Sequence, residues 1–152
     1  MSDSPQPSGS TPRGVLAGYH QAMLDKSADD LADLYAVEAV HEFPFTTPGF
    51  PARYTGREEV RAGYRAAWGA SPVEVREIRE VVVHQTADPE VIIAEHVVVA
   101  ALPATDRTVT VPGLLVLRVR DGLITWVRDY MDGLGVARAT GRLLETAVTP
   151  NA

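Results

Sequence analysis

Residues 109–131 read V-T-V-P-G-L-L-V-L-R-V-R-D-G-L-I-T-W-V-R-D-Y-M, and this stretch decides the fold. Runs rich in Val, Ile, Leu, Trp and Tyr flank an Asp-Gly pair, which is typical of a tight β-hairpin turn. In the second run, a strand would direct Asp129 to the same face as Val127 and Met131. Because burying a carboxylate among apolar side chains is costly, we expect Asp129 to have either a partner or a chemical role.

The composition narrows the class of protein. Of the 152 residues, 45% are hydrophobic and 22% charged, which is ordinary for one soluble globular domain. The net charge is −6 and the basic residues form no dense run, so neither nucleic acid nor a membrane is expected as a partner. Cysteine is absent, which excludes disulfides, thiolate nucleophiles and cysteine zinc sites. No stretch approaches the roughly 20 apolar residues of a membrane span, and we expect a cytoplasmic protein.

The pattern along the chain predicts one α+β domain over residues 13–148. Residues 1–12 are rich in Ser, Pro and Gly and are expected to form a disordered leader, with residues 149–152 as a tail. Apolar spacing predicts helices at 15–24, after the N-cap candidate Ser27, at 57–68 and at 134–148. Strands are predicted at 39–45, 73–85, 91–102 and in the hairpin, with a Pro- and Gly-rich loop at 46–56. Helices followed by long antiparallel strands indicate a curved sheet wrapped around a helix.

Four polar side chains stand among apolar neighbours, namely Asp129, His96, Glu42 and Tyr19. Together in one cavity they would form an acid–base site, in which an imidazole and a carboxylate exchange or orient a proton. The same residues could also have purely structural roles. Asp129 could pair with a neighbouring arginine, Arg128 or Arg118, and the other residues could be ordinary core or edge residues, as could His41 and the aromatic side chains. The four histidines lack metal-ligand spacing, and the chain has no nucleotide-binding loop and no nucleophile-elbow motif.

Three motifs resemble one known group. They are A-V-H-E-F-P-F at 39–45, Y-T-G-R-E-E-V-R-A-G-Y at 54–64 and D-G-L-I-T-W-V-R-D-Y-M-D at 121–132. Together they resemble the SnoaL-like branch of the nuclear-transport-factor-2-like superfamily, with its polyketide cyclases, ketosteroid isomerases and limonene-epoxide hydrolases. The resemblance spans residues 13–147. It implies a cone-shaped barrel, made of a strongly curved, mostly antiparallel sheet of about six strands closed by about three helices, and it implies a homodimer.

The resemblance supports different site residues for different groups of enzymes. Tyr19 matches the tyrosine that holds the oxyanion in ketosteroid isomerases, but their general-base Asp falls on Phe43 and their second acid near Leu114. Asp129 matches one acid of the epoxide-hydrolase Asp-Arg-Asp triad. The arginine of that triad falls on His96, and its other Asp falls on Val98. In the polyketide cyclases, and in a related phenazine-pathway group, an acid at or near the Asp129 position serves as the acid/base.

The resemblance therefore implies a cofactor-independent cyclase or isomerase that acts on a hydrophobic, polyketide-like or polycyclic small molecule. Asp129 would be the general acid/base, oriented by His96, with Glu42 as a second acid/base and Tyr19 as a donor to an enolate oxygen. The apolar wall of the pocket would comprise Trp68, Phe45, Phe50, Phe43, Val98, Leu114, Val127 and Met131. The alternatives are an epoxide hydrolase and a non-enzymatic ligand-binding module.

Overall fold

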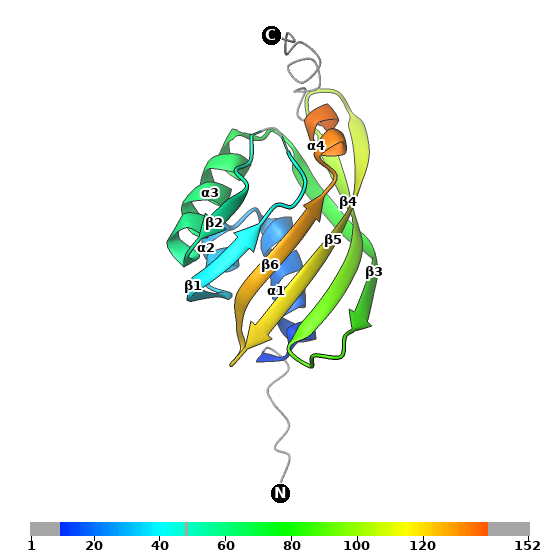
Figure 1. Cartoon of the computed structure of the whole chain (residues 1–152). Coiled ribbons are helices and arrows are strands. Elements are labelled where there is room, and N and C mark those ends of the chain that lie inside the picture. Colours follow the sequence, from blue (N-terminus) through cyan, green and yellow to red (C-terminus); the bar gives the residue numbers. More distant parts are fainter. Residues whose placement is uncertain (1–9, 48, 140–152) are drawn as a thin grey trace, which may run out of the picture.

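The computed structural model describes residues 10–47 and 49–139, and in them a curved sheet wraps around the helices (Figure 1). The helices are α1 (Pro12–Asp25), α2 (Ala28–Ala32), α3 (Arg57–Ala70) and α4 (Gly133–Ala139). The strands are β1 (Tyr35–Glu42), β2 (Arg53–Thr55), β3 (Glu74–Gln85), β4 (Val91–Leu102), β5 (Arg107–Arg120) and β6 (Leu123–Met131). The sheet order is β2-β1-β6-β5-β4-β3, so its two edges, β2 and β3, do not pair with each other. This is the predicted α+β cone, with four helices where the resemblance implied about three.

The hairpin formed by β5 and β6 confirms the turn prediction. Asp121 and Gly122 both have positive φ, 52° and 78°, as required by the two-residue turn whose twist matches that of its strands. The antiparallel register shifts between Arg118 and Val119, which leaves Thr125 as an extra residue in β6. Because of this bulge, Ile124 lies on the same buried face as Val127 and Asp129, which follow Thr125 in the strand.

Two side-chain caps position the first helices. The Thr11 hydroxyl accepts a hydrogen bond from the Gly14 amide at 3.1 Å at the start of α1, where Pro12 needs no amide partner. The Ser27 hydroxyl accepts from the Asp30 amide at 3.1 Å, so the predicted N-cap of α2 is confirmed. Thr11 and Pro12 fall inside the leader expected from composition, whereas residues 1–9 lie outside the described part of the chain.

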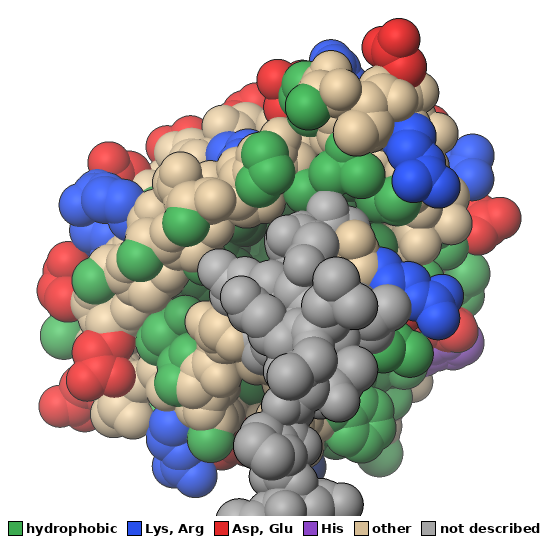
Figure 2. Space-filling view, turned by 90° about the horizontal axis from the view of Figure 1, so that it is seen from above, with side chains coloured by type: hydrophobic (Ala, Val, Ile, Leu, Met, Phe, Trp, Pro, Cys, Tyr) green, Lys and Arg blue, Asp and Glu red, His purple; other side chains and the backbone are tan. Residues whose placement is uncertain are grey.

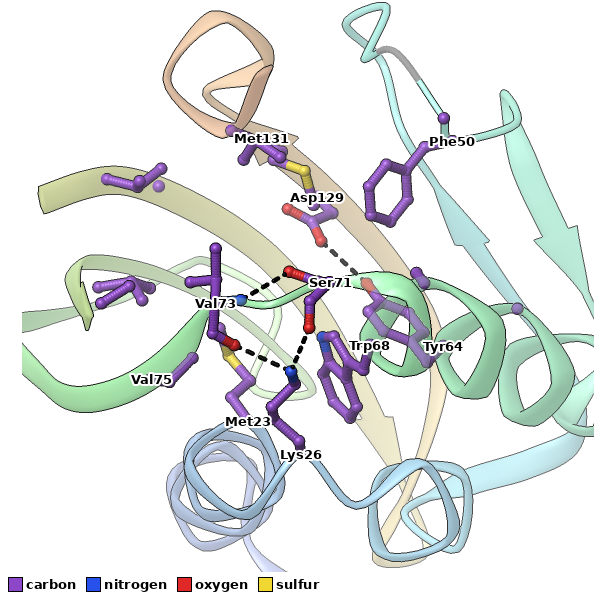
Figure 3. A pocket seen from close by; sticks show the side chains of 18 of the residues that line it. Met23, Lys26, Phe50, Tyr64, Trp68, Ser71, Val73, Val75, Asp129 and Met131 are labelled. Atoms are coloured by element: carbon purple, nitrogen blue, oxygen red, sulfur yellow. Dashed lines mark hydrogen bonds between the residues drawn. The ribbon is translucent and has the colours of Figure 1, made fainter. Parts of the chain in front are cut away.

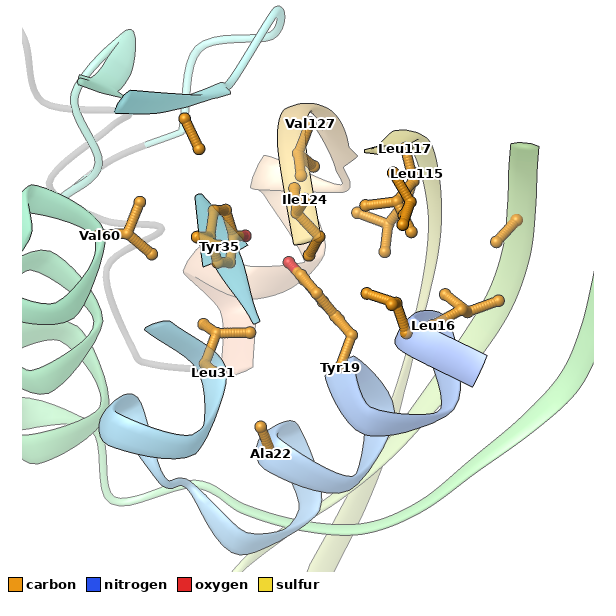
Figure 4. Packing of buried hydrophobic residues seen from close by; sticks show 14 of the residues in the cluster. Leu16, Tyr19, Ala22, Leu31, Tyr35, Val60, Leu115, Leu117, Ile124 and Val127 are labelled. Carbon is orange, nitrogen blue, oxygen red and sulfur yellow. The ribbon is translucent and has the colours of Figure 1, made fainter. Parts of the chain in front are cut away.

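The core lies between the concave face of the sheet and helices α1, α2 and α3 (Figure 4). Alternate residues of β5, Leu115 and Leu117, pack with Ile124 and Val127 of β6 from the sheet side. The helices contribute their apolar stripes, including Leu16, Ala22, Leu31 and Val60. Full burial of a Val, Leu or Ile side chain stabilises the fold by about 1.5–3 kcal/mol. No helix in the described ranges is long and apolar enough to cross a membrane.

Long-range pairing moves several predicted boundaries. The strand expected at 39–45 is β1, which begins at Tyr35 and ends at Glu42, because its start pairs in parallel with Ile124 of β6. Part of the loop predicted at 46–56 forms β2, which pairs antiparallel with the end of β1. The helix expected at 134–148 corresponds to α4 as far as Ala139, and its remainder lies outside the described residues. Partner strands, rather than the local pattern, explain the shift of β1 and the presence of β2.

Candidate active site

A cavity of about 480 Å³ lies between the concave face of the sheet and helices α1 and α3. Its volume is within the range of about 300–1,000 Å³ that is usual for small-molecule sites. Figure 3 shows apolar side chains around most of it, with Asp129 on the β6 side and Lys26 on the α1 side. From above, hydrophobic side chains border the middle of the molecule and charged ones lie mainly at its periphery (Figure 2). The cavity therefore suits a mostly apolar ligand with a few polar groups.

Asp129 projects from β6 into this cavity and is only 8% exposed. Its Oδ2 atom accepts a hydrogen bond from the Tyr64 hydroxyl at 3.3 Å and lies 3.2 Å from His41 Nε2. The arginines that could have formed a structural ion pair with it contact other carboxylates. Arg128 Nε lies 3.3 Å from Glu42 Oε2, and Arg118 pairs with Asp88 at 3.2 Å. The Asp129 carboxylate is therefore held by neutral or weakly basic groups, and it borders the cavity.

His41 is the centre of the polar network and is fully buried. Its Nδ1 lies 2.7 Å from the Tyr35 hydroxyl, and its Nε2 lies 3.2 Å from the Tyr64 hydroxyl as well as close to Asp129. These contacts are satisfied if Tyr35 donates to Nδ1 and the proton on Nε2 is donated to the carboxylate, and we assign this tautomer on that ground. The imidazole thus orients Asp129, the role that the sequence analysis gave to His96.

Three buried tyrosines surround this pair. Burial raises the pKa of Tyr19, Tyr35 and Tyr64 well above its usual value, and the nearby Asp129 carboxylate raises each pKa further. Their hydroxyls therefore remain protonated at neutral pH and can act as donors. In Figure 4 the Tyr19 side chain extends from α1 toward the sheet, and Tyr64 and Tyr35 are among the groups that influence its pKa. Protonated tyrosine hydroxyls therefore lie near the Asp129 carboxylate.

A second pair of imidazoles lies on the α1 side of β4. His96 borders the cavity and is 7% exposed, and its Nδ1 lies 3.3 Å from His20 Nε2. The two rings are nearly perpendicular, at 86°, with centroids 5.1 Å apart. Burial lowers the pKa of both residues, that of His20 from 6.5 to about 4, whereas the Asp129 carboxylate partly opposes the lowering at His96. Both rings are therefore neutral at pH 7.

The lowered pKa of His20 predicts an acid-sensitive contribution to stability. Between pH 6.5 and about 4 the unfolded chain binds more protons than the folded chain, so the free energy of unfolding falls as the pH is lowered. We expect the His20→Gln variant to lose less stability than the parent between about pH 7 and pH 4.5 in urea unfolding. Ala17→Gln, at an exposed neutral position of the same helix, should retain the parental pH dependence. Equal pH dependence in the His20 variant would contradict the prediction.

The structure places only part of the predicted wall around the cavity. Trp68, Phe50, Val98 and Met131 line it, as do three of the four predicted polar residues, Asp129, His96 and Tyr19. Lys26, Tyr64 and Ser71 also line it, although the sequence analysis did not single them out. The Lys26 ammonium donates to the carbonyl oxygens of Ser71 and Val73 at 3.0 and 2.9 Å, which ties the end of α1 to the segment after α3.

Glu42 and four predicted wall residues lie elsewhere. Glu42 faces the outer side of the sheet with Arg128, because it alternates with the inward-facing His41. Phe45 is 60% exposed and packs on Tyr130, and Leu114 faces the outer side beside Leu115. Phe43 and Val127 are buried but do not border the cavity: Phe43 packs behind Phe50, and Val127 belongs to the core. The prediction that these residues line the pocket was wrong.

His41 was the residue that sequence reasoning underestimated. It alternates with Ala39 and Phe43, a pattern that indicates one buried strand face, yet it was also considered as an edge residue. No cluster of three or more His, Asp or Glu side chains in the described ranges could hold a metal ion.

Comparison with known proteins now places the chain in a family. The model of the SnoaL-like domain matches residues 16–127. An uncharacterized PhzA/B-like protein of Pseudomonas aeruginosa is 31% identical over 146 residues, which cover 88% of this chain and 96% of that protein. The uncharacterized protein YesE of Bacillus subtilis is 28% identical over 132 residues, covering 84% of this chain and 85% of YesE.

Solved structures show the same architecture. A candidate isomerase from Bacillus subtilis superposes with a TM-score of 0.78 at 25% identity, covering 90% of this chain and 97% of that one. A candidate polyketide cyclase from Xanthomonas campestris superposes with a TM-score of 0.63 at 22% identity, covering 86% and 95%. The second likeness shows the fold alone. The chain belongs to the SnoaL-like domain family and has the nuclear-transport-factor-2-like fold.

Proposed function

We propose that this protein is a cofactor-independent enzyme of the cyclase or isomerase type, which moves a proton next to a carbonyl group of a hydrophobic polyketide-like or polycyclic molecule. One observation supports this above all. Asp129 borders a mostly apolar cavity, and its carboxylate is held by contacts with His41 and Tyr64. Family membership and the likeness to the candidate isomerase point to the same class of reaction.

In the proposed reaction Asp129 removes a proton from the carbon next to the carbonyl. The electron pair of the broken C–H bond moves into the new C=C bond, and the carbonyl oxygen becomes an enolate oxygen. In a cyclase the enolate carbon then attacks a second carbonyl carbon of the same molecule, and the oxygen of that carbonyl takes up the proton from Asp129. In an isomerase Asp129 returns the proton to a different carbon of the conjugated enolate. Tyr19 lines the cavity and its hydroxyl retains its proton, so we propose that it donates to the enolate oxygen.

The rival functions receive less support. An epoxide hydrolase of the limonene type would use an Asp-Arg-Asp triad, but the described lining of the cavity contains neither an arginine nor a second carboxylate. A ligand-binding module needs only the cavity, and a computationally designed binder of 17-OHP has the same fold at a TM-score of 0.62. That alternative gives no reason for a carboxylate on the cavity wall.

Exchange of acidic C–H protons tests the proposal without knowledge of the natural substrate. The protein is incubated in deuterated water with a panel of hydrophobic cyclic ketones, such as β-tetralone, and deuterium incorporation is followed by mass spectrometry. We expect saturable exchange that is at least about 100-fold above that in buffer for one or more ketones. Binding without exchange across the panel would favour the ligand-binding module, and diol formation from simple epoxides would favour the hydrolase.

We further propose that the protein is a homodimer formed through the outer face of the sheet. A shallow hollow on this face is lined by apolar side chains, among them Ile93, Leu114, Val116 and Tyr130. We expect Leu114→Glu to convert the dimer to a monomer, because a carboxylate would be buried in the interface. Light scattering coupled to gel filtration measures the mass, and Ala62→Glu, on the exposed side of α3, should remain dimeric. A monomeric parent protein would exclude the dimer.

A further inference from the structure

The His20–His96 pair is separate from the hydrogen-bond network around Asp129. His96 makes its observed hydrogen bond through Nδ1, to His20. Its other nitrogen, Nε2, has no hydrogen bond among the described residues, although the ring borders the cavity. His96 Nε2 is therefore a polar nitrogen at the cavity that has no hydrogen-bond partner among the described residues.

The position of Gly113 gives the direction of Nε2. His96 of β4 pairs with Gly113 of β5, and Gly113 pairs in turn with Met131 of β6. A Cβ atom on Gly113 would lie 2.8 Å from His96 Nε2, so the ring extends over this glycine. Asp129 stands two residues before Met131 and points to the same concave face. His96 Nε2 thus reaches across β5 toward the strand that carries the carboxylate, in the space that the missing side chain leaves.

We infer that His20 is a positioning residue that keeps the proton of His96 on Nε2. The Nε2–H group of His96 then donates a hydrogen bond to the oxygen of the substrate carbonyl, which is adjacent to the carbon that Asp129 deprotonates. This inference rests on the proposed function. The enolate oxygen would then have two hydrogen-bond donors, His96 on β4 and Tyr19 on α1. This arrangement also assigns a purpose to an imidazole, His20, that does not line the cavity.

The electrostatics of the pair support this tautomer. The one proton between His20 Nε2 and His96 Nδ1 can belong to either ring, since both rings are neutral. The charged group that acts on His96 is the Asp129 carboxylate on β6, and the group that acts on His20 is His96 itself. The negative charge of Asp129 favours an N–H bond of His96 that points toward it. The proton of His96 therefore lies on Nε2, and Nδ1 accepts the hydrogen bond from His20. Neutral imidazoles in this form serve as electrophiles in enolising enzymes.

Long-range proton–nitrogen NMR spectra of the full chain identify the tautomer directly. In the parent protein at neutral pH we expect a protonated Nε2 and an unprotonated Nδ1 on His96. His20→Leu removes the donor to Nδ1 and should give a mixture of tautomers, whereas His20→Gln supplies an amide donor and should largely retain the parental form. His84→Gln, at an exposed histidine paired with Glu95, is the matched control and should leave the His96 signals unchanged. A proton on Nδ1 in the parent, or an unchanged tautomer in His20→Leu, would overturn the assignment.

Binding of β-naphthol, a flat apolar ring with one hydroxyl oxygen, tests the donor role. We expect His20→Leu to weaken β-naphthol binding a few-fold, because only the molecules with a proton on Nε2 can donate to the naphthol oxygen. Naphthalene, which has no oxygen, should bind as it does to the parent. The His20→Gln variant should bind β-naphthol like the parent. Equal effects on both probes, or no effect on either, would exclude His96 as the donor.

These measurements separate the two proposals. The tautomer and the hydroxyl-specific loss of binding are measured without turnover, so they remain informative if no ketone is exchanged. Conversely, ketone exchange that depends on Asp129 but not on His20 would leave the proposed function standing and would overturn the role of the imidazole pair.

Discussion

Asp129→Asn is expected to slow ketone proton exchange by about 100- to 10,000-fold, the usual contribution of a positioned general base. The amide has the size of the carboxylate and can still accept from the Tyr64 hydroxyl, but it cannot take up a proton from carbon. The loss should therefore appear in the turnover number more than in the Michaelis constant, since the cavity that binds the ketone is unchanged.

The matched control for this experiment is Glu42→Gln. Glu42 was the other acid expected to act in the reaction, but its carboxylate pairs with Arg128 on the outer face of the sheet. We expect this variant to exchange protons within about threefold of the parent rate, because its side chain does not meet the substrate. Asp129→Asn with a rate in the same range would remove Asp129 from the mechanism. A large loss in Glu42→Gln would show that the reaction site lies elsewhere.

His41→Leu is expected to have the largest effect on stability. The histidine is fully buried and contacts the Tyr35 hydroxyl, the Tyr64 hydroxyl and the Asp129 carboxylate. Leucine fills much of the volume but leaves these polar groups without their shared partner. We expect the free energy of unfolding to fall by about 3–5 kcal/mol, as when one member of a buried polar pair is removed.

Urea unfolding followed by circular dichroism measures this loss. The control is His84→Gln on the exposed side of β3, where we expect a change below about 0.5 kcal/mol. In a His41→Leu background, Asp129→Asn should cost less than in the parent, because the two side chains act as a unit. A loss below about 1 kcal/mol in His41→Leu, or additive costs in the double variant, would show that His41 does not hold Asp129.

Local patterns in the sequence determined much of the fold. The Asp-Gly pair specifies the turn between β5 and β6, because both of its residues adopt positive φ. Ser27 marks the start of α2, because its hydroxyl binds an amide three residues further along the chain. The alternation in β6 placed Asp129 on the buried face, since successive side chains of a strand point to opposite sides. Each of these features depends on residues only a few positions apart.

The tertiary structure decided which residues meet at the cavity. Asp129 and His41 are 88 positions apart and come together because β1 pairs in parallel with β6. Alternation fixes the face of a side chain but not the strand beside it, so the sequence could not choose between His41 and His96 as the partner of Asp129. For the same reason Phe45 and Leu114, which are apolar and close to the site in the sequence, lie outside the cavity. Contacts between distant strands depend on register and order in the sheet, and the whole folded chain determines both.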